Sequence, residues 1–399
     1  MNRRNFVKKS GLAATGVLAG ASLAWSSSLG YLSNSTINIG VIGTGSRGSG
    51  LIPLLNDIEG INVSGCCDVL PFRLEDGILK TGSKAKGYTD YRNLLDDKAL
   101  DAVLIATPFS THAPIAIDAL DAGKHVYCEK TMAKGYQDIH RVLKKVNQSS
   151  TIFQTGHQYH SSRLYSEIVE SIKAGKIGKI ISFECQWNRN GDWRRPVSDP
   201  SLEKAINWRM YREFSGGLVA ELCSHQIDFV NWVLDETPEQ IVGIGGIDYW
   251  KDGRETYDNV HLVHSYPNGV KATFRCLTAN ALNDYKIKVH GDKGTIVLDY
   301  TDAWIYYENQ FEDRILGDVD GVSGATVSYK AAKGEPIAVK HADPSKQALI
   351  DFRDSILKNE QPLSNALTGA NTARAVQMSL DAMHENRIMY WSDLPNLDD

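Results

Sequence analysis

The segment INIGVIGTGSRGSG, residues 37–50, decides the fold of the N-terminal half of this chain. A short apolar run leads directly into Gly43-x-Gly45-x-x-Gly48 and then into a helix-compatible segment, so we predict a strand, a tight turn and a helix. In such a unit the first glycine permits the turn, the second lets the backbone approach a pyrophosphate, and the third lets helix and strand pack closely. The helix N-terminus adds free N–H groups and a positive dipole end. The segment predicts a dinucleotide-binding turn built from Gly43, Gly45, Ser46, Arg47 and Gly48.

The acid that such a site needs follows at the end of the next predicted strand. This strand, INVSGCCD, ends in Asp68, about 20 residues past the last glycine, where a carboxylate would bind the ribose 2′-hydroxyl. Because a carboxylate repels a 2′-phosphate, Asp68 favours NAD as the cofactor. Arg73 nearby keeps NADP as the less favoured alternative. A plain strand–helix–strand unit without a nucleotide is the remaining interpretation.

Residues 36–155 alternate short apolar runs with amphipathic stretches, which predicts a doubly wound parallel sheet. Ligands bind such sheets at the carboxyl ends of the strands. Two polar motifs fall at these ends: ATP-x-x-x-H, from Ala106 to His112, and EKT, from Glu129 to Thr131. We therefore place further cofactor contacts at Thr107, Pro108, His112, Glu129 and Lys130.

The pattern changes from residue 156 onward. A helix, an irregular stretch rich in Trp and Arg, and a second helix precede a run of alternating strands, which predicts an open, mainly antiparallel sheet. Residues 300–345 carry no clear pattern, and two amphipathic helices close the chain. We divide the chain into residues 1–35, an N-terminal α/β domain at 36–155 and a C-terminal α/β domain at 156–399.

Residues 1–35 read as an export signal. NRRNFVK, residues 2–8, is a twin-arginine pattern followed by a mildly apolar run that is too short and too glycine-rich to span a bilayer permanently. Twin-arginine signals are addresses read by a receptor. We therefore expect a periplasmic protein with no stable membrane anchor, cleaved after Ala21 or Ala24. An incidental basic N-terminus is the alternative.

Composition excludes some classes of partner and of site. A net charge of −5 gives no electrostatic footprint for nucleic acid. The six cysteines are scattered without a CxxC motif, so spacing selects no disulfide pair. His157-x-x-His160 lacks a nearby third ligand, and we expect no metal site.

Two sets of side chains could carry chemistry. Glu221 and His225 are four residues apart on a predicted helix, so their side chains share a face. A carboxylate beside an imidazole orients the ring and stabilises its charged form, as a general base requires. Lys130, at a strand end, could polarise a substrate hydroxyl. The alternatives are a solvated Glu–His pair and a surface lysine.

These motifs, in this order, resemble those of the Gfo/Idh/MocA family of NAD(P)-dependent oxidoreductases. GTGSRG matches the nucleotide turn, ATPFSTH the family's ATP-x-x-x-H and CEKT its EKP, while GGLVAELCSHQIDFVNW matches GG-x-x-x-D-x-G-x-H-x-x-D. The resemblance spans roughly residues 36–365. It implies Lys130, Glu221 and His225 as the catalytic set, and a C-terminal domain whose large open sheet serves for homo-oligomerisation. Thr131, Glu221 and Cys223 depart from the usual Pro, Asp and Gly.

The substrate pocket is predicted from two further segments. GHQYHSS stands where many relatives have GF-x-x-R, and the stretch from Trp187 to Arg212 interleaves aromatic and arginine side chains. Aromatic faces pack on sugar rings while Asn and Arg bind hydroxyls. Loop filling and ordinary core aromatics are the alternatives. We predict that the substrate contacts are His157, Tyr159, His160, Trp193, Arg194, Trp208 and Tyr211.

Three functions fit the sequence. The first is an NAD-dependent dehydrogenase of a sugar or glycoside, in which hydride leaves a ring carbinol for tightly held NAD. The second is an NAD-dependent glycoside hydrolase or lyase that oxidises C3 transiently and eliminates the aglycone, with Tyr159, His157 or His160 as the extra base. The third is a sugar-binding protein that kept the fold, because fold alone does not fix function.

Overall fold

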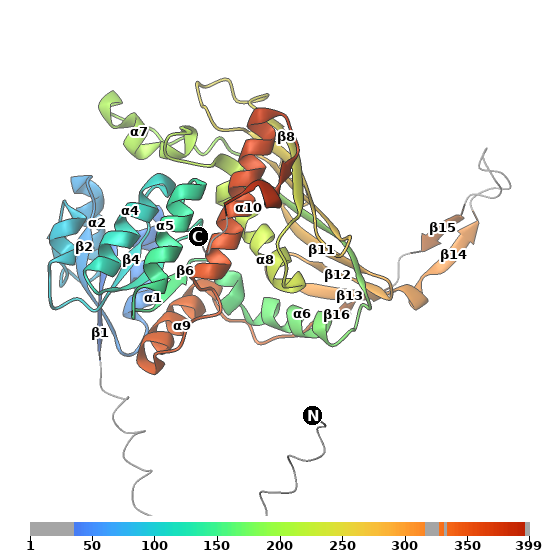
Figure 1. Ribbon diagram of the computed structural model, residues 1–399, viewed down its shortest axis with the longest axis horizontal. Helices are drawn as coiled ribbons and strands as arrows, with labels where there is room; N and C mark the ends of the chain where they lie inside the picture. The colour runs from blue at the N-terminus through green and yellow to red at the C-terminus, as the bar shows by residue number, and fades with distance from the viewer. Residues whose placement is uncertain (1–35, 316–326, 331–332, 396–399) are drawn as a thin grey trace, which may run out of the picture. The chain divides into compact units, whose positions relative to one another are not determined.

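The computed structural model describes residues 36–315, 327–330 and 333–395. A six-stranded parallel sheet with the order β3-β2-β1-β4-β5-β6 forms its N-terminal part (Figure 1). Its strands are β1 (Ile37–Ile42), β2 (Ile61–Cys67), β3 (Lys86–Tyr88), β4 (Ala102–Ile105), β5 (His125–Cys128) and β6 (Phe153–Thr155). The strand order reverses between β1 and β4, which is where doubly wound sheets bind ligands. The predicted doubly wound parallel sheet is confirmed.

Helices from both ends of the chain cover this sheet. The connecting helices are α1 (Ser46–Asn56), α2 (Pro71–Lys80), α3 (Tyr91–Leu95), α4 (His112–Asp121) and α5 (Tyr136–Asn147). The late helix α9 (Pro344–Lys358) also packs here, because the ring of Phe352 meets Tyr127 edge-on at a centroid distance of 5.7 Å. The division at residue 155 stays a prediction, and the structure adds that the end of the chain returns to the first sheet.

The second sheet has nine strands in the order β16-β13-β12-β11-β7-β10-β9-β8-β17. Among its pairs only β7–β10 is parallel, which confirms the predicted mainly antiparallel sheet. Its strands are β7 (Ile180–Asn188), β8 (Gln240–Gly246), β9 (Asn259–Ser265), β10 (Lys271–Leu277), β11 (Tyr285–Gly291), β12 (Gly294–Leu298), β13 (Ala303–Tyr307), β16 (Glu335–Pro336) and β17 (Met389–Tyr390).

The patternless stretch 300–345 contributes β13 and β16 to this sheet, and it also forms a separate hairpin from β14 (Glu312–Ile315) and β15 (Val327–Lys330).

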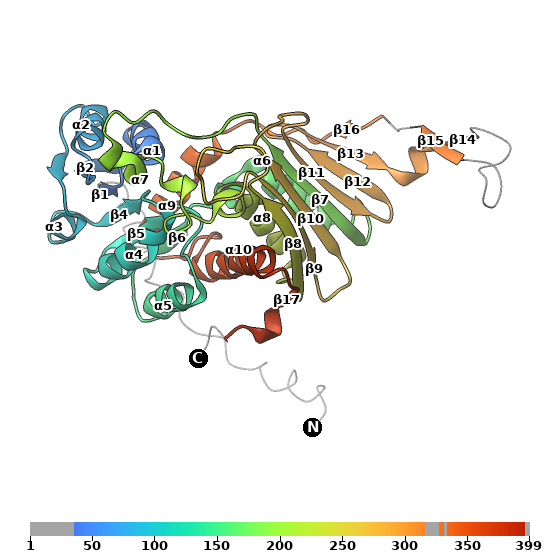
Figure 2. The same ribbon diagram turned by 90° about the horizontal axis from the view of Figure 1, so that it is seen from above.

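The nine-stranded sheet buries one face and exposes the other. In β9 and β10 buried and exposed side chains alternate, as expected for a half-covered antiparallel sheet. Helices α6 (Arg163–Lys173), α8 (Ser224–Leu234) and α10 (Ala366–Glu385) lie against the buried face (Figure 2). A π-helical turn, η6 (Val219–Cys223), leads directly into α8. These two segments carry Glu221 and His225.

Neither a disulfide bond nor a membrane-spanning helix is found among the described residues. All six cysteines are buried free thiols, and the closest approach is 3.1 Å, between Sγ of Cys223 and Sγ of Cys276. In the part of the chain that the structure describes, no helix has the length and apolar character needed to cross a membrane. The predicted export signal lies outside the described residues.

Candidate active site

The glycine turn after β1 has the geometry that a bound pyrophosphate requires. Gly43 has a φ of +89°, and a Cβ there would lie 2.6 Å from the carbonyl oxygen of Ala106. At Gly48 a Cβ would lie only 1.8 Å from the carbonyl oxygen of Gly43, so helix α1 packs directly on the turn. Gly45 precedes the helix, and no described side chain caps it. The first N–H groups of α1 are therefore left for an anionic ligand.

This turn opens into a cavity of about 840 Å³ at the carboxyl ends of the strands. Its volume is that of an ordinary cofactor or ligand site. Gly48 does not line it, in keeping with its packing role. The predicted cofactor and catalytic residues that do line it are Gly43, Gly45, Ser46, Arg47, Asp68, Thr107, Pro108, His112, Glu129, Lys130, Glu221 and His225.

Asp68 is held in place as a ribose-binding carboxylate would be. Its side chain accepts hydrogen bonds from the backbone N–H of Thr44 and of Leu70, each at 2.9 Å. Arg73 lines the same end of the cavity, with Nη1 3.6 Å from the position of a Cβ on Gly45. Burial lowers the pKa of Arg73, although the nearby Asp68 opposes that shift. The fixed carboxylate, the free N–H groups and the glycine turn together fit NAD.

The other predicted cofactor residues hold the cavity wall together. Arg47 Nε donates to Glu129 Oε1 at 2.7 Å, so these two charges satisfy each other. The ring nitrogens of the buried His112 lie 2.9 Å from the carbonyl oxygen of Thr131 and 3.0 Å from that of Thr107. His112 thus ties the ATP and EKT segments to each other.

Lys130 reaches the helix that carries the other two predicted catalytic residues. Its Nζ donates to the carbonyl oxygens of Ala220, at 3.2 Å, and of Glu221, at 3.0 Å. These acceptors lie in η6, whose wide turn leaves carbonyl groups unused by the ordinary helical pattern. The lysine therefore sits in the cavity with an ammonium group fixed by backbone oxygens.

The expected pairing of Glu221 with His225 is not formed, and that interpretation is corrected. Glu221 instead accepts a hydrogen bond from Arg209 Nε at 2.7 Å. The π-helical turn is the reason: it widens the helix between positions 221 and 225, so a four-residue spacing no longer stacks the two side chains. In the described residues, Nδ1 of His225 is buried without a hydrogen-bond partner.

The protonation states follow from burial and from the surrounding cations. Burial lowers the pKa of His225 well below its usual value, and the positive charges of Lys130 and Arg47 lower it further. Burial also lowers the pKa of Lys130, against the opposing pull of Glu221. Burial alone would raise the pKa of Glu221, but Arg209 and Lys130 bring it below its ordinary value. At neutral pH the site offers a neutral imidazole at His225 and an ionised carboxylate at Glu221, which pairs with Arg209.

The residues predicted from GHQYHSS lie behind the cavity and do not line it. His157 and His160 are buried around Asp228, with ring nitrogens 3.8 and 2.9 Å from its carboxylate oxygens. Tyr159 stacks on Tyr165 at a centroid distance of 4.1 Å and contacts the ring of His225 at 5.1 Å. Tyr159 and His157 thus pack against the His225 ring from the interior of the protein.

Most of the predicted aromatic and arginine contacts build a segment that crosses the cavity. We call residues 189–215, between β7 and η6, the strap; it includes η4 (Pro200–Leu202), α7 (Glu203–Ile206) and η5 (Trp208–Met210). Arg194 pairs with Glu203 and with Asp252, and Tyr211 Oη donates to Glu203 at 3.0 Å. Arg194, Tyr211 and Trp193 do not line the cavity; of the predicted strap contacts only Trp208 does.

The strap brings residues of the C-terminal part onto the nucleotide-binding part. Figures 1 and 2 both place α7 over the N-terminal sheet and its helices. The guanidinium group of Arg195, on the strap, lies near enough to Arg73 of the N-terminal part for its positive charge to lower the pKa of Arg73. Among the cavity residues that were not predicted as contacts are Gln158, Trp187, Arg189, Arg195 and Arg209. All five belong to stretches with a sequence signal, Gln158 to GHQYHSS and the other four to the stretch from Trp187 to Arg212.

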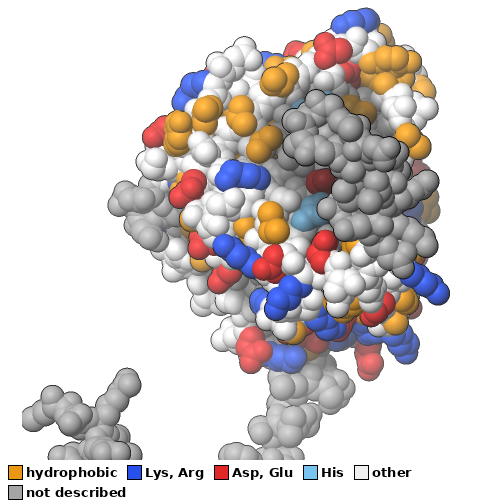
Figure 3. Space-filling model, turned by 90° about the vertical axis from the view of Figure 1, so that its right-hand side faces the viewer, with side chains coloured by type: hydrophobic (Ala, Val, Ile, Leu, Met, Phe, Trp, Pro, Cys, Tyr) orange, Lys and Arg blue, Asp and Glu red, His pale blue; other side chains and the backbone are white. Residues whose placement is uncertain are grey.

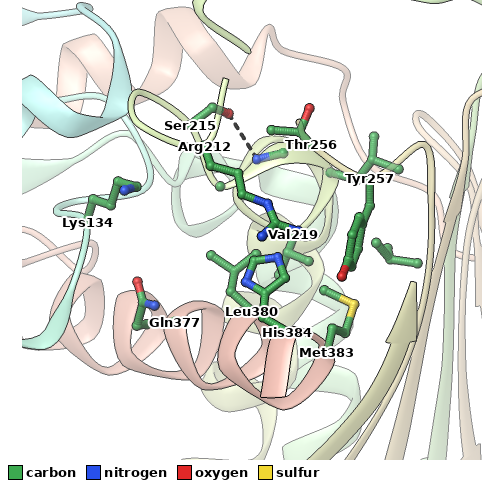
Figure 4. Close-up of a pocket in the computed structure, with 14 residues that line it drawn as sticks. Lys134, Arg212, Ser215, Val219, Thr256, Tyr257, Gln377, Leu380, Met383 and His384 are labelled. Atoms are coloured by element: carbon green, nitrogen blue, oxygen red, sulfur yellow. Dashed lines mark hydrogen bonds between the residues drawn. The ribbon is translucent and has the colours of Figure 1, made fainter. Parts of the chain in front are cut away.

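A smaller cavity of about 170 Å³ is lined in part by Ser215, Gly216 and Gly217, which precede η6 (Figure 4). Ser215 Oγ accepts a hydrogen bond from the Gly217 N–H at 2.9 Å in its wall. This cavity shares no lining residue with the larger one, and no predicted site residue lines it. Among the described side chains no group of three or more metal ligands is found.

A glycine turn, a ribose-type carboxylate, a lysine and a buried histidine around one cavity define a dinucleotide-dependent enzyme. Comparison with known families identifies which one. A model described as oxidoreductase family, NAD-binding Rossmann fold, matches residues 37–157, and one described as the GFO/IDH/MocA C-terminal domain matches residues 165–297. The chain belongs to the Gfo/Idh/MocA family of oxidoreductases, and its cofactor is NAD.

Individual relatives are distant but cover most of the chain. It is 26% identical over 350 residues to the 2,7-anhydro-N-acetylneuraminate hydratase of Escherichia coli (strain K12), which covers 84% of this chain and 87% of that protein. It is 26% identical over 268 residues to the myo-inositol 2-dehydrogenase of Thermotoga maritima, a match that covers 66% of this chain and 75% of that protein. The fold is that of a levoglucosan dehydrogenase solved with NADH and levoglucosan, with a TM-score of 0.72 and 20% sequence identity. The superposition covers 91% of this chain and 100% of that chain.

Proposed function

We propose that this enzyme oxidises a ring carbinol of a sugar or glycoside. The observation that carries the proposal is the single cavity in which the glycine turn, Lys130 and His225 meet. When bound there, NAD supplies the acceptor for a hydride. The inositol and levoglucosan dehydrogenases among the similar proteins support a cyclic polyol or sugar as the class of substrate.

The protein groups have separate tasks in this reaction. His225, neutral because burial and cations lower its pKa, would take the hydroxyl proton. Lys130, fixed by two carbonyl oxygens, would donate a hydrogen bond to the same oxygen as negative charge develops there. Glu221 would act through its charge, because it favours the protonated form of Lys130. The support of His225 that the sequence assigned to Glu221 would come instead from packing against Tyr159.

A second candidate is cleavage of a glycoside by transient oxidation at C3 and elimination, with NAD restored at the end. The similarity to the anhydro-neuraminate hydratase, over more of both chains than the match to the inositol dehydrogenase, favours this candidate. His157, Tyr159 and His160 do not line the cavity, so the second base would have to be another lining residue.

One experiment separates these two functions. The purified protein is denatured to identify and count its bound nucleotide, and is then incubated with a panel of glycosides. Oxidised sugar accompanied by a stoichiometric absorbance rise at 340 nm, before any re-oxidation, supports the dehydrogenase. Release of the aglycone with no lasting absorbance change supports the eliminating enzyme. A protein that carries no NAD and changes no sugar would remove both.

We predict that the strap slows the release of NAD. The backbone of Arg195 is fixed by Asn207, whose side chain accepts from Arg195 N at 2.8 Å and donates to Arg195 O at 3.0 Å. Arg195→Gln should raise the NAD dissociation rate about tenfold, since losing one charged contact costs roughly 1.4 kcal/mol or more. Stopped-flow release into excess competing nucleotide measures this rate. Lys204→Gln, on the same strap but outside the cavity, should leave it unchanged.

Periplasmic localisation by the twin-arginine route is part of the proposal. Its support is the NRRNFVK pattern of residues 2–8 together with a cofactor that the chain must acquire before export. The double change Arg3→Lys and Arg4→Lys should leave the precursor in the cytoplasm, as fractionation and immunoblotting would report. Normal export of that variant would exclude this route.

Homo-oligomerisation through the open sheet is also proposed. The outer face of the nine-stranded sheet, which Figure 3 views, mixes hydrophobic with charged side chains. Val242, Ile244 and Val263 are 43%, 75% and 39% exposed there, around a hollow of about 650 Å³. Such a patch marks a protein interface. Ile244→Glu should lower the mass measured by light scattering, whereas a wild-type monomer at micromolar concentration would contradict the proposal.

A further inference from the structure

The charges in the large cavity do not balance. Two of its cations have carboxylate partners at 2.7 Å, Arg47 with Glu129 and Arg209 with Glu221. Arg73 and Arg195 lie together at the end that holds Asp68, where a pyrophosphate would neutralise them. Arg92 pairs with Asp90 at 3.5 Å. The arginine that remains is Arg189, which lines the same cavity at the other end.

Arg189 and His225 both lie next to the ring of Trp187. The guanidinium carbon of Arg189 is 5.6 Å from the centre of the Trp187 ring, and that ring is 5.7 Å from the ring of His225. Within the described residues no carboxylate oxygen comes within 4.0 Å of Arg189. Asp284, the residue before β11, accepts a hydrogen bond from Tyr300 Oη at 3.5 Å. The positive charge of Arg189 also opposes the rise that burial causes in the pKa of Tyr300, so the guanidinium lies near that hydroxyl and offers a planar anion the N–H groups that Tyr300 leaves free.

The backbone that carries Arg189 is fixed on both sides. The N–H of Arg189 donates to the carbonyl oxygen of Leu277 at 2.7 Å, at the end of β10. The preceding Asn188 donates from its backbone to Asp284 at 2.7 Å and from its side chain to Leu282 at 3.0 Å. The backbone from which the Arg189 side chain extends is therefore fixed by the sheet, as a specificity contact requires.

We propose that the substrate is an anionic sugar, such as a uronic acid or its glycoside, whose carboxylate binds Arg189. The inference rests on the proposed function and names its class of substrate. A guanidinium binds a carboxylate through two parallel N–H···O bonds, which fixes the orientation of the ring as well as its affinity. The carboxylate on one side and the Lys130–His225 pair on the other would then select the carbon that is oxidised.

The test compares two substrates that differ in one group. 4-Nitrophenyl β-D-glucuronide and 4-nitrophenyl β-D-glucoside are incubated with the NAD-loaded wild type, with Arg189→Gln and with Arg189→Lys. Single-turnover absorbance at 340 nm and release of 4-nitrophenol are both recorded. Arg163→Gln is the matched control, because Arg163 is an exposed arginine on α6 outside the cavity.

Wild type should prefer the glucuronide by about 10- to 100-fold in kcat/KM, the range expected for one charge-assisted pair at a partly exposed site. Arg189→Gln should abolish this preference by lowering kcat/KM for the glucuronide more than for the glucoside, and Arg189→Lys should restore part of it. A wild-type preference for the glucoside, or a preference that survives in Arg189→Gln, overturns the inference and leaves the proposed function standing. If neither compound is oxidised or cleaved, and neither alters the fluorescence of bound NADH, the proposed function fails and this inference fails with it.

Discussion

Replacing His225 by alanine should slow oxidation of the substrate by about 10²–10⁴-fold, the usual worth of a positioned general base. NAD binding should be retained, because the residues expected to hold the nucleotide, Asp68 and the glycine turn, lie on other elements than His225, which belongs to α8. Single-turnover reduction of bound cofactor measures the chemical step directly. His140→Ala, on α5 and outside the cavity, is the matched control and should react at the wild-type rate.

The pH dependence of the same reaction tests the protonation states. The pKa of His225 lies well below 6.5 in the folded enzyme, so the base is ready at neutral pH and the rate should fall only at more acid pH. Glu221→Gln should leave this acid limb in place, because Glu221 pairs with Arg209 and does not contact His225. Glu221→Gln should instead lower the pKa of Lys130, because the ammonium group loses a stabilising negative charge. The fall in rate on the alkaline side of the pH–rate profile should therefore move to lower pH. A wild-type rate in His225→Ala, or an acid limb that moves in Glu221→Gln, would contradict these assignments.

Substituting Gly48 by alanine should destabilise the fold and abolish stoichiometric NAD binding. A Cβ at this position would lie 1.8 Å from the carbonyl oxygen of Gly43, and neither atom belongs to a side chain that can rotate away. Helix α1 would have to move off the turn that holds the pyrophosphate. Overpacking of this kind costs at least about 1–3 kcal/mol. Urea denaturation and quantification of bound nucleotide would report the two effects separately.

Gly50 provides the control within the same helix. A Cβ at Gly50 meets no atom within 4 Å, and the residue is exposed on α1. Gly50→Ala should therefore leave NAD binding unchanged and raise the free energy of unfolding by up to about 1 kcal/mol, because alanine favours the helix. Full NAD occupancy and normal stability in Gly48→Ala would show that the turn tolerates a wider separation from α1.

Sequence patterns were sufficient wherever function depends on local backbone geometry. Gly43, Gly45 and Asp68 act through a turn and a strand end, and such features are written in consecutive residues. Short apolar runs separated by amphipathic stretches likewise predicted the parallel sheet, and strands of alternating apolar and polar residues predicted the second sheet, because a half-covered strand exposes its two faces in turn. The contribution of residues 300–345 to the second sheet was missed, since its strands there are short and one of them, β16, has only two residues.

Tertiary structure decided the partners of each charged side chain. Whether Glu221 meets His225 or Arg209 depends on a π-helical turn that the sequence spacing does not reveal. Arg194 and Tyr211 are residue types that often bind sugars, but here both contact Glu203 within the strap. Arg195, the next residue after Arg194, lines the cavity instead. Residue types determine what chemistry is available. Long-range packing, which brings residues more than a hundred positions apart around one cavity, determines which of them can perform it.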